Sequence, residues 1–373
     1  MKLDDKALKE KYDHFMLKEI LEQPAVLRDT IDDRIRPGVG GKSIDLGEMN
    51  LDAEWLAQVH NIYIAACGTS YHAGLVGKYA IEGLTGIHVE VDLASEFRYR
   101  NPLLGDKTLV VVISQSGETA DTLEAMRMAK EKGARILAVV NVEDSTIPQE
   151  AHHVLYTRAG VEVAVASTKA YVTQLAAMYL IAGYFAQQLN TIPRGEIDAI
   201  ASALKEIPEK TEEAMGLSWS MRGLAPSLAS KSSCFYTGRC LDYPVAMEGS
   251  LKLKEITYIH ATPYAAGELK HGTLALIEEG VPVVAVATQE HVYDRMYGNL
   301  QELIDRGAYT IGVTCEGNNA LGEIVDRAVH VPKTLLSPIV SVIPLQFLAY
   351  YTAVEKGTNI DKPRNLTKSV RHE

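Results

Sequence analysis

Short apolar runs alternate with longer segments of helical periodicity along most of the chain. The runs are rich in valine, isoleucine and alanine, whereas the longer segments repeat apolar residues at helical spacing. Continuous apolar strands separated by helices are typical of a parallel sheet that is covered on both faces. The pattern predicts strands over residues 61–67, 88–93, 108–114, 135–141, 233–238, 281–287 and 309–314, and helices over residues 70–84, 118–133, 167–189, 243–259, 291–307 and 338–357.

The same order of elements occurs twice, which indicates an internal duplication. Two weak self-matches support it: YIAACGTS at 63–70 resembles FYTGRCLD at 235–242, and LASEF at 93–97 resembles YAAGEL at 264–269. We therefore predict an α/β fold with two doubly wound, flavodoxin-like parallel-sheet domains related by duplication. The predicted parts are a helical lead-in over 1–52, a first domain over 53–193, a helical linker over 194–224, a second domain over 225–360 and a C-terminal tail over 361–373.

The net charge of -11 argues against binding to nucleic acid or to anionic lipid, because no lysine- and arginine-rich stripe offsets it. Two long stretches, residues 170–193 and 334–354, carry no formal charge, and membrane spans are one interpretation of them. The first contains three glutamines, and the second contains Pro338, Pro344 and Gln346. Buried helices at a domain or subunit interface are therefore the favoured interpretation.

The cysteines and the N-terminal residues indicate a reducing, cytoplasmic location. Cys67, Cys234, Cys240 and Cys315 form no CxxC pair, which argues against a disulfide framework and against a zinc site. The first 24 residues are highly charged and lack the apolar core of a signal peptide. We expect neither a metal ion nor an organic cofactor.

The motif SQSGET directly follows a strand rich in β-branched residues and precedes a helix. A helix that begins there offers free backbone N–H groups and the positive end of its dipole. Ser114, Gln115, Ser116 and Thr119 add polar side chains, and Gly117 permits close approach of the backbone. Open α/β sheets bind ligands at the carboxyl ends of their strands. The motif therefore predicts a phosphate site that needs no lysine or arginine.

Two other interpretations of this motif are weaker. Ordinary helix capping needs one serine or threonine, whereas the loop carries four polar residues in six positions. A Rossmann dinucleotide site would need a GxGxxG motif after a strand, and none follows any predicted strand. The second repeat has VAVATQEHV at the matching place, where Glu290 would repel an anion. We therefore expect only the first repeat to keep the phosphate site.

Six motifs together resemble the isomerase part of the glucosamine-6-phosphate synthases. That family consists of the glutamine–fructose-6-phosphate aminotransferases (isomerizing), within the sugar-isomerase (SIS) superfamily. The motifs are ACGTS, SQSGETADT, VASTKA, EGSLKLKEI, YAAGELKHG and DKPRNLTKSV, and the resemblance runs from about Phe15 to Val370. SQSGET alone would indicate only the superfamily, whereas the tail motif is more specific. The resemblance implies two SIS domains and conversion of fructose 6-phosphate to an aldose phosphate, with ammonia giving glucosamine 6-phosphate for hexosamine biosynthesis.

The resemblance also implies a role for each residue on a matching motif. Lys368 would form a Schiff base with the C2 carbonyl, and Glu255 would move the proton between C1 and C2, assisted by Glu248 and Lys252. His271 would open the sugar ring in the site of a neighbouring subunit, which implies a homodimer. Contacts to the sugar phosphate would come from Cys67, Gly68, Thr69, Ser70, Ser114, Gln115, Ser116, Thr119, Val165 and Ser167.

Spacing alone leaves some of these roles open. Glu248, Lys252 and Glu255 fall on one helical face, which also suits an exposed ladder of ion pairs. Lys368 on its own would be a solvated lysine, and only the motif match favours a catalytic role. Cys67 is expected to pack or to form a hydrogen bond rather than to act as a nucleophile.

The chain also departs from the family pattern. The N-terminal glutaminase domain of the family begins with a nucleophilic cysteine. We expect that domain to be absent here because Lys2 follows Met1, and a separate glutaminase subunit is an alternative source of ammonia. Thr367 replaces the usual alanine, and residues 371–373 are atypical, which affects the expected ammonia transfer rather than sugar binding.

Two alternative functions remain. One is a fructosamine-6-phosphate deglycase or amino-sugar-phosphate deaminase of the same superfamily, and the intact tail motif argues against it. The other is a non-catalytic sugar-phosphate sensor, which the complete set of Glu255, His271 and Lys368 argues against.

Overall fold

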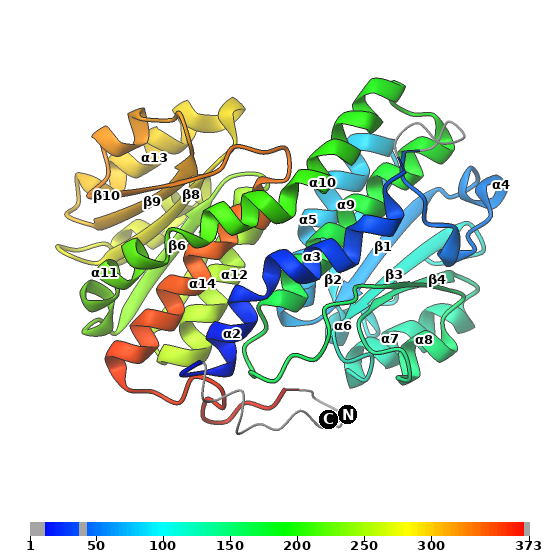
Figure 1. Ribbon diagram of the computed structural model, residues 1–373, viewed down its shortest axis with the longest axis horizontal. Helices are drawn as coiled ribbons and strands as arrows, with labels where there is room; N and C mark the ends of the chain where they lie inside the picture. Colours follow the sequence, from blue (N-terminus) through cyan, green and yellow to red (C-terminus); the bar gives the residue numbers. More distant parts are fainter. Residues whose placement is uncertain (1–11, 37–42, 369–373) are drawn as a thin grey trace. The chain divides into compact units, whose positions relative to one another are not determined.

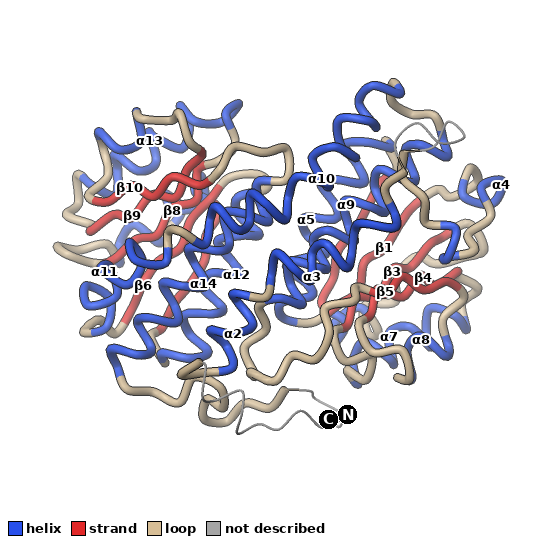
Figure 2. The backbone as a smooth tube through the Cα atoms, viewed as in Figure 1, coloured by secondary structure: helices blue, strands red, loops and turns tan. Residues whose placement is uncertain are grey.

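The computed structural model describes residues 12–36 and 43–368, which form two compact units. The first unit comprises residues 25–162 and 169–208, and the second comprises residues 12–24, 163–168 and 209–368. Each unit contains a parallel sheet flanked by helices (Figures 1 and 2). The start of the predicted lead-in, its glycine-rich segment at 37–42 and the tail residues 369–373 lie outside the described residues.

The first unit is built on a five-stranded parallel sheet in the order β2-β1-β3-β4-β5. Its strands are β1 (Asn61–Ala66), β2 (His88–Leu93), β3 (Thr108–Ser114), β4 (Arg135–Val140) and β5 (His153–Tyr156). One face is covered by α5 (Gly68–Thr85), backed by α9 (Lys169–Leu189), and the other by α7 (Ala120–Glu131) and α8 (Thr146–Glu150) (Figure 1). The shorter elements are α3 (Gln23–Ile31), η1 (Asp32–Arg34), η2 (Gly47–Met49), α4 (Ala53–Leu56) and α6 (Ala94–Phe97).

The central strands of this sheet, which the apolar runs in the sequence predicted, are almost completely buried. Every residue of β3 is buried, as is all of β1 and β4 beyond their first residue. Their side chains pack against α7 in a core that includes Tyr63, Val110 and Met126. Strand β5 was not predicted, because it has only four residues, of which His153 and Leu155 are buried, whereas the edge strand β2 was predicted from its alternating residues.

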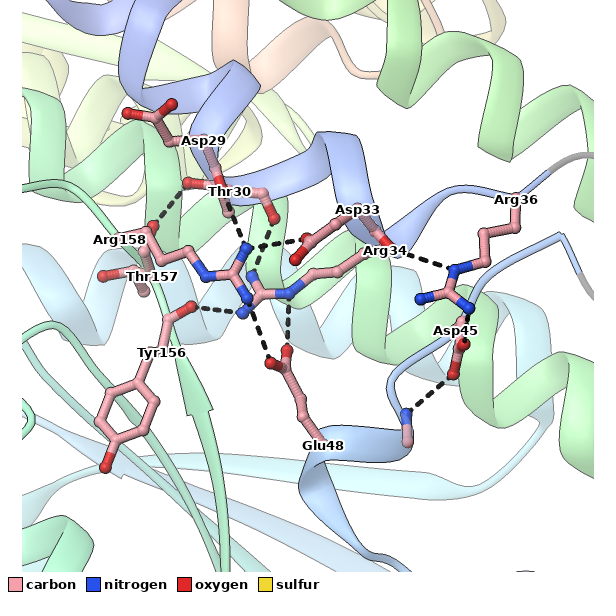
Figure 3. Close-up of polar contacts among 11 residues, drawn as sticks. Asp29, Thr30, Asp33, Arg34, Arg36, Asp45, Glu48, Tyr156, Thr157 and Arg158 are labelled. Carbon is pink, nitrogen blue, oxygen red and sulfur yellow. Dashed lines mark hydrogen bonds and ion pairs between the residues drawn. The ribbon is translucent and has the colours of Figure 1, made fainter.

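Arg34 anchors the end of the lead-in to the first unit (Figure 3). Its side chain is 2% exposed, and its guanidinium donates to the Glu48 carboxylate at 2.6 Å and to the backbone oxygen of Tyr156 at 2.8 Å. Arg158 donates to Asp33 at 2.8 Å and to Glu48 at 3.3 Å. These charge-assisted bonds join the segment after α3 to the end of β5.

The second unit repeats the architecture with the strand order β10-β9-β8-β6-β7. Its strands are β6 (Ser233–Gly238), β7 (His260–Ala265), β8 (Pro282–Ala287), β9 (Tyr309–Cys315) and β10 (Arg327–Val331). Helices α12 (Asp242–Thr257), α14 (Ser337–Lys356) and α11 (Ser218–Ala229) form one layer, and α13 (Tyr293–Ile304) covers the other face (Figure 1). The remaining elements are α2 (Phe15–Leu21), η3 (Ala266–His271), η4 (Thr273–Leu276), η5 (Glu290–Val292) and η6 (Ala320–Glu323), and the boundary between the units falls within α10 (Arg194–Met215).

The edge strands of the second sheet were also missing from the prediction. Strand β7 contains Pro263, which has no N–H group to donate and is tolerated at the edge of a sheet. Strand β10 is five residues long and half exposed. The fold class is nevertheless confirmed, because both sheets are parallel and both carry helices on their two faces.

The two uncharged stretches form the helices α9 and α14, which are buried within their own units. Nearly every residue of α9 is buried from Lys169 to Ala186, and α14 is buried from Ser337 to Tyr350. Among the described helices, α14 alone is long and apolar enough to cross a membrane, but 89% of its apolar window lies inside the fold. Both stretches are therefore buried helices rather than exposed membrane spans, whereas their predicted place at a domain or subunit interface stays a prediction.

The turns after β1 and β6 support the internal repeat. Gly68 and Cys240 occupy the same place after their strands, and both have a φ of 52°. Glycine adopts such a left-handed φ readily, whereas cysteine rarely does. The turn geometry has therefore been kept in the second unit although its glycine is absent. The same correspondence pairs Ser70 with Asp242.

Candidate functional site

The predicted site residues are divided between the two units, and each group is described within its own unit. The first unit contains the residues around Cys67 and the SQSGET loop, residues 114–119. The second unit contains Val165, Ser167, Glu248, Lys252, Glu255, His271 and Lys368.

In the first unit, α5 and α7 begin directly beyond the carboxyl ends of the neighbouring strands β1 and β3. The strand order reverses between these two strands, which is where open parallel sheets bind ligands. Cys67 and Thr119 stand at the N-caps of the two helices, and neither side chain caps its helix. Both helices therefore present first-turn N–H groups that these cap side chains leave unbonded.

The SQSGET loop is shaped by its own hydroxyl groups. Ser114 is buried, and its Oγ accepts a hydrogen bond from the Gly117 N–H at 3.1 Å and lies 3.0 Å from Thr119 Oγ1. Ser116 Oγ accepts from the N–H of Glu118 at 3.2 Å. Ser114 thus mainly holds the shape of the loop, whereas Gln115, Ser116 and Thr119 are only half-buried.

Gly117 is required by the geometry of this loop. It has a φ of 66°, and a Cβ atom placed on it would lie 1.9 Å from Ser145 Oγ. Its backbone oxygen also accepts the N–H of Ile147 at 3.0 Å. No other residue type fits this position unless the loop moves.

Cys67 and Ser70 lie at the start of α5. Burial raises the pKa of the Cys67 thiol, and its Sγ lies 3.9 Å from Thr122 Oγ1. A thiol with a raised pKa is a poor nucleophile at neutral pH. Ser70 is buried, and its Oγ accepts a hydrogen bond from Gln174 Nε2 at 3.0 Å. Both side chains are therefore held in place before any ligand binds.

In the second unit, Glu248, Lys252 and Glu255 form a buried ionic triad on α12. Lys252 Nζ lies 3.4 Å from Glu248 Oε1 and 2.7 Å from Glu255 Oε2. The side chains of Glu248 and Lys252 are 0% exposed, and that of Glu255 is 19% exposed. The alternative of an exposed ladder is therefore wrong, although the three residues share one face as their spacing predicted. Only Glu255 keeps access to solvent.

Val165 and Ser167 lie in the loop over residues 163–168, which is fixed from two sides. The Glu19 carboxylate is 1% exposed and accepts hydrogen bonds from two backbone N–H groups of this loop. The N–H of Val165 donates to the backbone oxygen of Asp361 at 3.0 Å. The loop is therefore tied both to α2 and to the C-terminal tail.

The tail that carries Lys368 is anchored at several points. The Asp361 carboxylate accepts the N–H groups of the first two residues of α2, each at 3.0 Å. The N–H of Arg364 donates to the Tyr258 hydroxyl at 3.0 Å, and its guanidinium lies 4.1 Å from the centre of the Tyr258 ring. Tyr258 is the C-cap of α12, so the tail begins against the helix that carries the triad. Lys368 itself is half-buried.

His271 is the last residue of η3 and is exposed. Within the described part of the chain it forms no hydrogen bond or ion pair with another predicted site residue. Its expected role in the site of a neighbouring subunit stays a prediction.

Asp242 was not predicted as part of any site. It is 1% exposed, and its carboxylate accepts the N–H groups of Thr288 at 2.7 Å and Gln289 at 3.3 Å, together with the Thr288 hydroxyl. Thr288 follows β8 as Gln115 follows β3. The second unit therefore satisfies the donors after its central strand with an internal carboxylate. The repeat alignment carried this signal, because Asp242 stands where the first unit has Ser70.

This carboxylate also accounts better than Glu290 for the expected loss of a phosphate site after β8. Glu290 is exposed and forms an ion pair with Lys333, which offsets its charge. The expectation that Glu290 repels an anion therefore needs correction. The donors after β8 are already occupied by Asp242.

Asp242 should make the protein less stable as the pH rises from about 4 to about 6. Burial raises its pKa to about 6, against a usual value of 3.8, while hydrogen bonds from Thr288 act in the opposite direction. The folded protein therefore binds this proton more tightly than the unfolded chain, and unfolding releases it within this pH window. Relative to Asp242→Asn, the wild type should lose up to about 3 kcal/mol of unfolding free energy between these pH values.

Urea unfolding at both pH values measures this difference. Asp326→Asn is the matched control, because the exposed Asp326 accepts similar hydrogen bonds from Thr310 at 2.7 and 2.9 Å. An identical pH dependence in the wild type and Asp242→Asn would contradict the assignment.

Comparisons with known proteins bear on both units. A family model for the SIS domain matches residues 55–183 and 227–356. A glutamine–fructose-6-phosphate aminotransferase [isomerizing] of Clostridium tetani is 54% identical over 368 residues, 98% of this chain and 60% of that protein. A relative of the same name from Methanosarcina acetivorans is 45% identical over 361 residues, 96% of this chain and 58% of that protein. The chain thus spans about 60% of the length of these curated relatives.

A solved structure matches nearly from end to end. The C-terminal domain of glucosamine-fructose-6-phosphate aminotransferase from Francisella tularensis is 38% identical, with a TM-score of 0.89. The match covers 95% of this chain and 99% of that domain. The chain therefore belongs to the SIS domain family, with two tandem SIS domains of the kind that forms the C-terminal part of glutamine–fructose-6-phosphate aminotransferases.

Proposed function

We propose that the chain is the isomerase part of a glutamine–fructose-6-phosphate aminotransferase. It binds fructose 6-phosphate and converts the ketose to an aldose phosphate, and it forms glucosamine 6-phosphate when ammonia is supplied. The observation that carries this proposal is the buried triad on α12. Withdrawing three charged groups from water costs several kcal/mol per ion, so an apolar set would give a more stable core. The triad keeps one carboxylate, Glu255, accessible, as a proton-transfer base must be.

The SQSGET loop is proposed to bind the phosphate group. Its support is the uncapped N-terminus of α7 at the point where the strand order reverses, with half-buried polar side chains around it. Two helix N-termini supply partial positive charge there without any lysine or arginine. Thr69, Ser70 and the loop with Val165 and Ser167 are proposed to contact the sugar hydroxyls.

Glu255 and Lys368 have separate roles in the proposed chemistry. Glu255 removes a proton from C1 of the open-chain ketose while O2 takes up a proton, which gives an enediol. A proton returned to C2 and the loss of the O1 proton then complete the aldose phosphate. For amination, the Lys368 amine adds to the C2 carbonyl and water leaves. Ammonia then displaces the lysine amine to give the C2 imine, and transfer of a proton from C1 to C2, with loss of the O1 proton and protonation of the C2 nitrogen, yields the amino sugar. Glu248 and Lys252 orient Glu255 in both reactions.

A homodimer is proposed in which His271 of one subunit opens the sugar ring in the site of the other. The exposure of His271 supports such an exchange. His271→Ala and Lys368→Ala chains should each fail to form glucosamine 6-phosphate from fructose 6-phosphate and ammonia, and refolded together they should regain part of this activity. No recovery in verified mixed dimers would place the whole site within one chain.

Incubation with fructose 6-phosphate tests the proposed function. Glucose 6-phosphate should appear, and added glutamine should have no effect on the rate. Release of a free amine from fructosamine 6-phosphate without any isomerase activity would instead support the deglycase alternative. Binding without turnover would support the sensor.

Gly117→Ala should weaken the binding of fructose 6-phosphate by at least about tenfold. The new methyl group would clash with Ser145, so the loop must move away from the start of α7. A charge-assisted hydrogen bond contributes roughly 1.5–3 kcal/mol, and losing one lowers the affinity about ten- to a hundredfold. Calorimetric titration measures the affinity. Gly83→Ala is the control, because its Cβ would meet no atom within 4 Å, and wild-type binding by Gly117→Ala would contradict this role.

A further inference from the structure

We propose that the second unit contains a separate anion-binding pocket that takes a small phosphomonoester. The pocket has a volume of about 230 Å³ and is lined by residues of the turn after β6, of η3 and of α13. It lies at the carboxyl ends of parallel strands, beside the point where the strand order reverses between β6 and β8. Open α/β sheets bind ligands at this place. The proposal does not depend on the proposed isomerase activity.

Two arginines in the pocket have no acidic partner within the described part of the chain. The Arg239 guanidinium donates to Asn299 Oδ1 at 2.6 and 3.1 Å, and Asn299 is 5% exposed. Neither Arg239 nor Arg295 forms an ion pair with any residue in the described ranges 12–36 and 43–368. The third cation, Lys270, is paired with Glu302 at 2.5 Å. A fixed guanidinium beside a second, exposed one suits a phosphate dianion.

Asp294 is the carboxylate in the lining that lacks an ion pair among the described residues. It lies in the first turn of α13, where a negative charge complements the helix dipole. One unpaired carboxylate against two unpaired guanidinium groups leaves the pocket with an excess of positive charge.

The first unit fills the equivalent place with packed side chains. The buried positions of α7 (Thr122, Ala125, Met126 and Ala129) have the same spacing as those of α13 (Met296, Asn299, Leu300 and Leu303), so Ala125 corresponds to Asn299. Ala125 and Met126 are fully buried, and Cys67, at the position of Arg239, packs against their core. The second unit has thus replaced a close-packed patch by an open, basic pocket. A buried asparagine in place of an alanine is costly unless its polar atoms are bonded, and here the partner is Arg239.

A smaller cavity in the first unit shows the contrast. It has a volume of about 150 Å³ and is lined by Arg34 and its neighbours (Figure 3). Arg34 is paired there with Glu48, and Arg36 is paired with Asp45 at 3.3 Å. Those guanidinium groups already have their counter-charges, so that cavity has no unbalanced cation for a ligand.

Titration with inorganic phosphate tests the pocket directly. The wild type should bind phosphate, and Arg239→Met and Arg295→Gln should each weaken one binding event roughly ten- to a hundredfold. Gly298→Leu should have a similar effect by filling the pocket without changing its charge, since a Cβ at Gly298 meets no atom within 4 Å. Arg327→Gln on the opposite edge of the sheet is the control and should bind as the wild type does. Calorimetry gives the affinities, and circular dichroism verifies that each variant is folded.

Three results would contradict the proposed anion-binding role of this pocket. They are no phosphate binding by the wild type, unchanged binding by folded Arg239→Met and Gly298→Leu, and a single binding event that Gly117→Ala abolishes. The last result would assign all the binding to the SQSGET loop. A wild-type protein that binds phosphate in the Arg239 pocket but has no isomerase activity would contradict only the proposed function.

Discussion

Lys252→Met should destabilise the second unit by about 3–5 kcal/mol and abolish isomerase activity. The substitution leaves the carboxylates of Glu248 and Glu255 beside each other without the ammonium that both contact. Removing one partner of a buried ion pair costs this much because the remaining charge keeps its desolvation penalty without compensation. Urea unfolding of the purified chain measures the loss.

Two further variants separate stability from chemistry. Lys254→Met removes another lysine of the same helix, whose pKa is lowered by burial and raised in part by the charge of Glu255, and it should cost much less than Lys252→Met. The combined variant Glu248→Gln, Lys252→Met and Glu255→Gln removes every charge of the triad, so it should regain stability but stay inactive. A Lys252→Met protein as stable as the wild type would show that the three side chains do not form a buried ionic cluster.

Borohydride treatment in the presence of fructose 6-phosphate should attach the mass of the sugar to Lys368 and to no other lysine. Reduction of a Schiff base fixes the sugar covalently to the amine that formed it. Lys368→Ala should lose the adduct completely while keeping its fold, because the tail is anchored upstream by Asp361 and Arg364. Peptide mass mapping locates the adduct.

Lys362→Ala is the control for this experiment, because Lys362 is an exposed lysine of the same tail. It should give the adduct at the wild-type yield. An adduct that maps to Lys252 or Lys270 would move the imine chemistry away from the tail.

The central strands were predictable from the sequence because burial on both faces demands an uninterrupted apolar run. Strand β3 shows this, since all of its residues are buried. The edge strands β5, β7 and β10 were not predicted, because at least half of the residues of each stay accessible and none has a long apolar run. The edge strand β2 was predicted because its apolar residues Val89, Val91 and Leu93 alternate with polar ones. Pro263 within β7 further weakens the strand signal.

The parts of the candidate site that could be predicted are formed by residues close together in the sequence. The polar loop after β3 and the shared face of Glu248, Lys252 and Glu255 follow from spacing alone. The burial of Lys252 does not, because it depends on the packing of α12 between the sheet and α14. The contact of Asp242 with Thr288 joins residues 46 positions apart, so no local pattern reveals it.

The pocket at Arg239 shows the same limit. Its residues come from three segments, the turn after β6, η3 and α13, and only the fold places them together. The comparison of the two repeats does place the polar residues Arg239 and Asn299 where the first unit has Cys67 and Ala125, and the strand and helix patterns alone do not reveal this difference.

The uptake of deuterium by fructose 6-phosphate in heavy water tests most directly the claim that Glu255 moves a proton at C1. The wild type should exchange one of the two C1 hydrogens for deuterium, because a fixed carboxylate reaches the carbon from one side. Glu255→Gln should slow this exchange by about 10²–10⁴-fold, the usual contribution of a positioned general base. Glu355→Gln, an exposed control on α14, should exchange like the wild type. Exchange by Glu255→Gln at the wild-type rate would contradict the account.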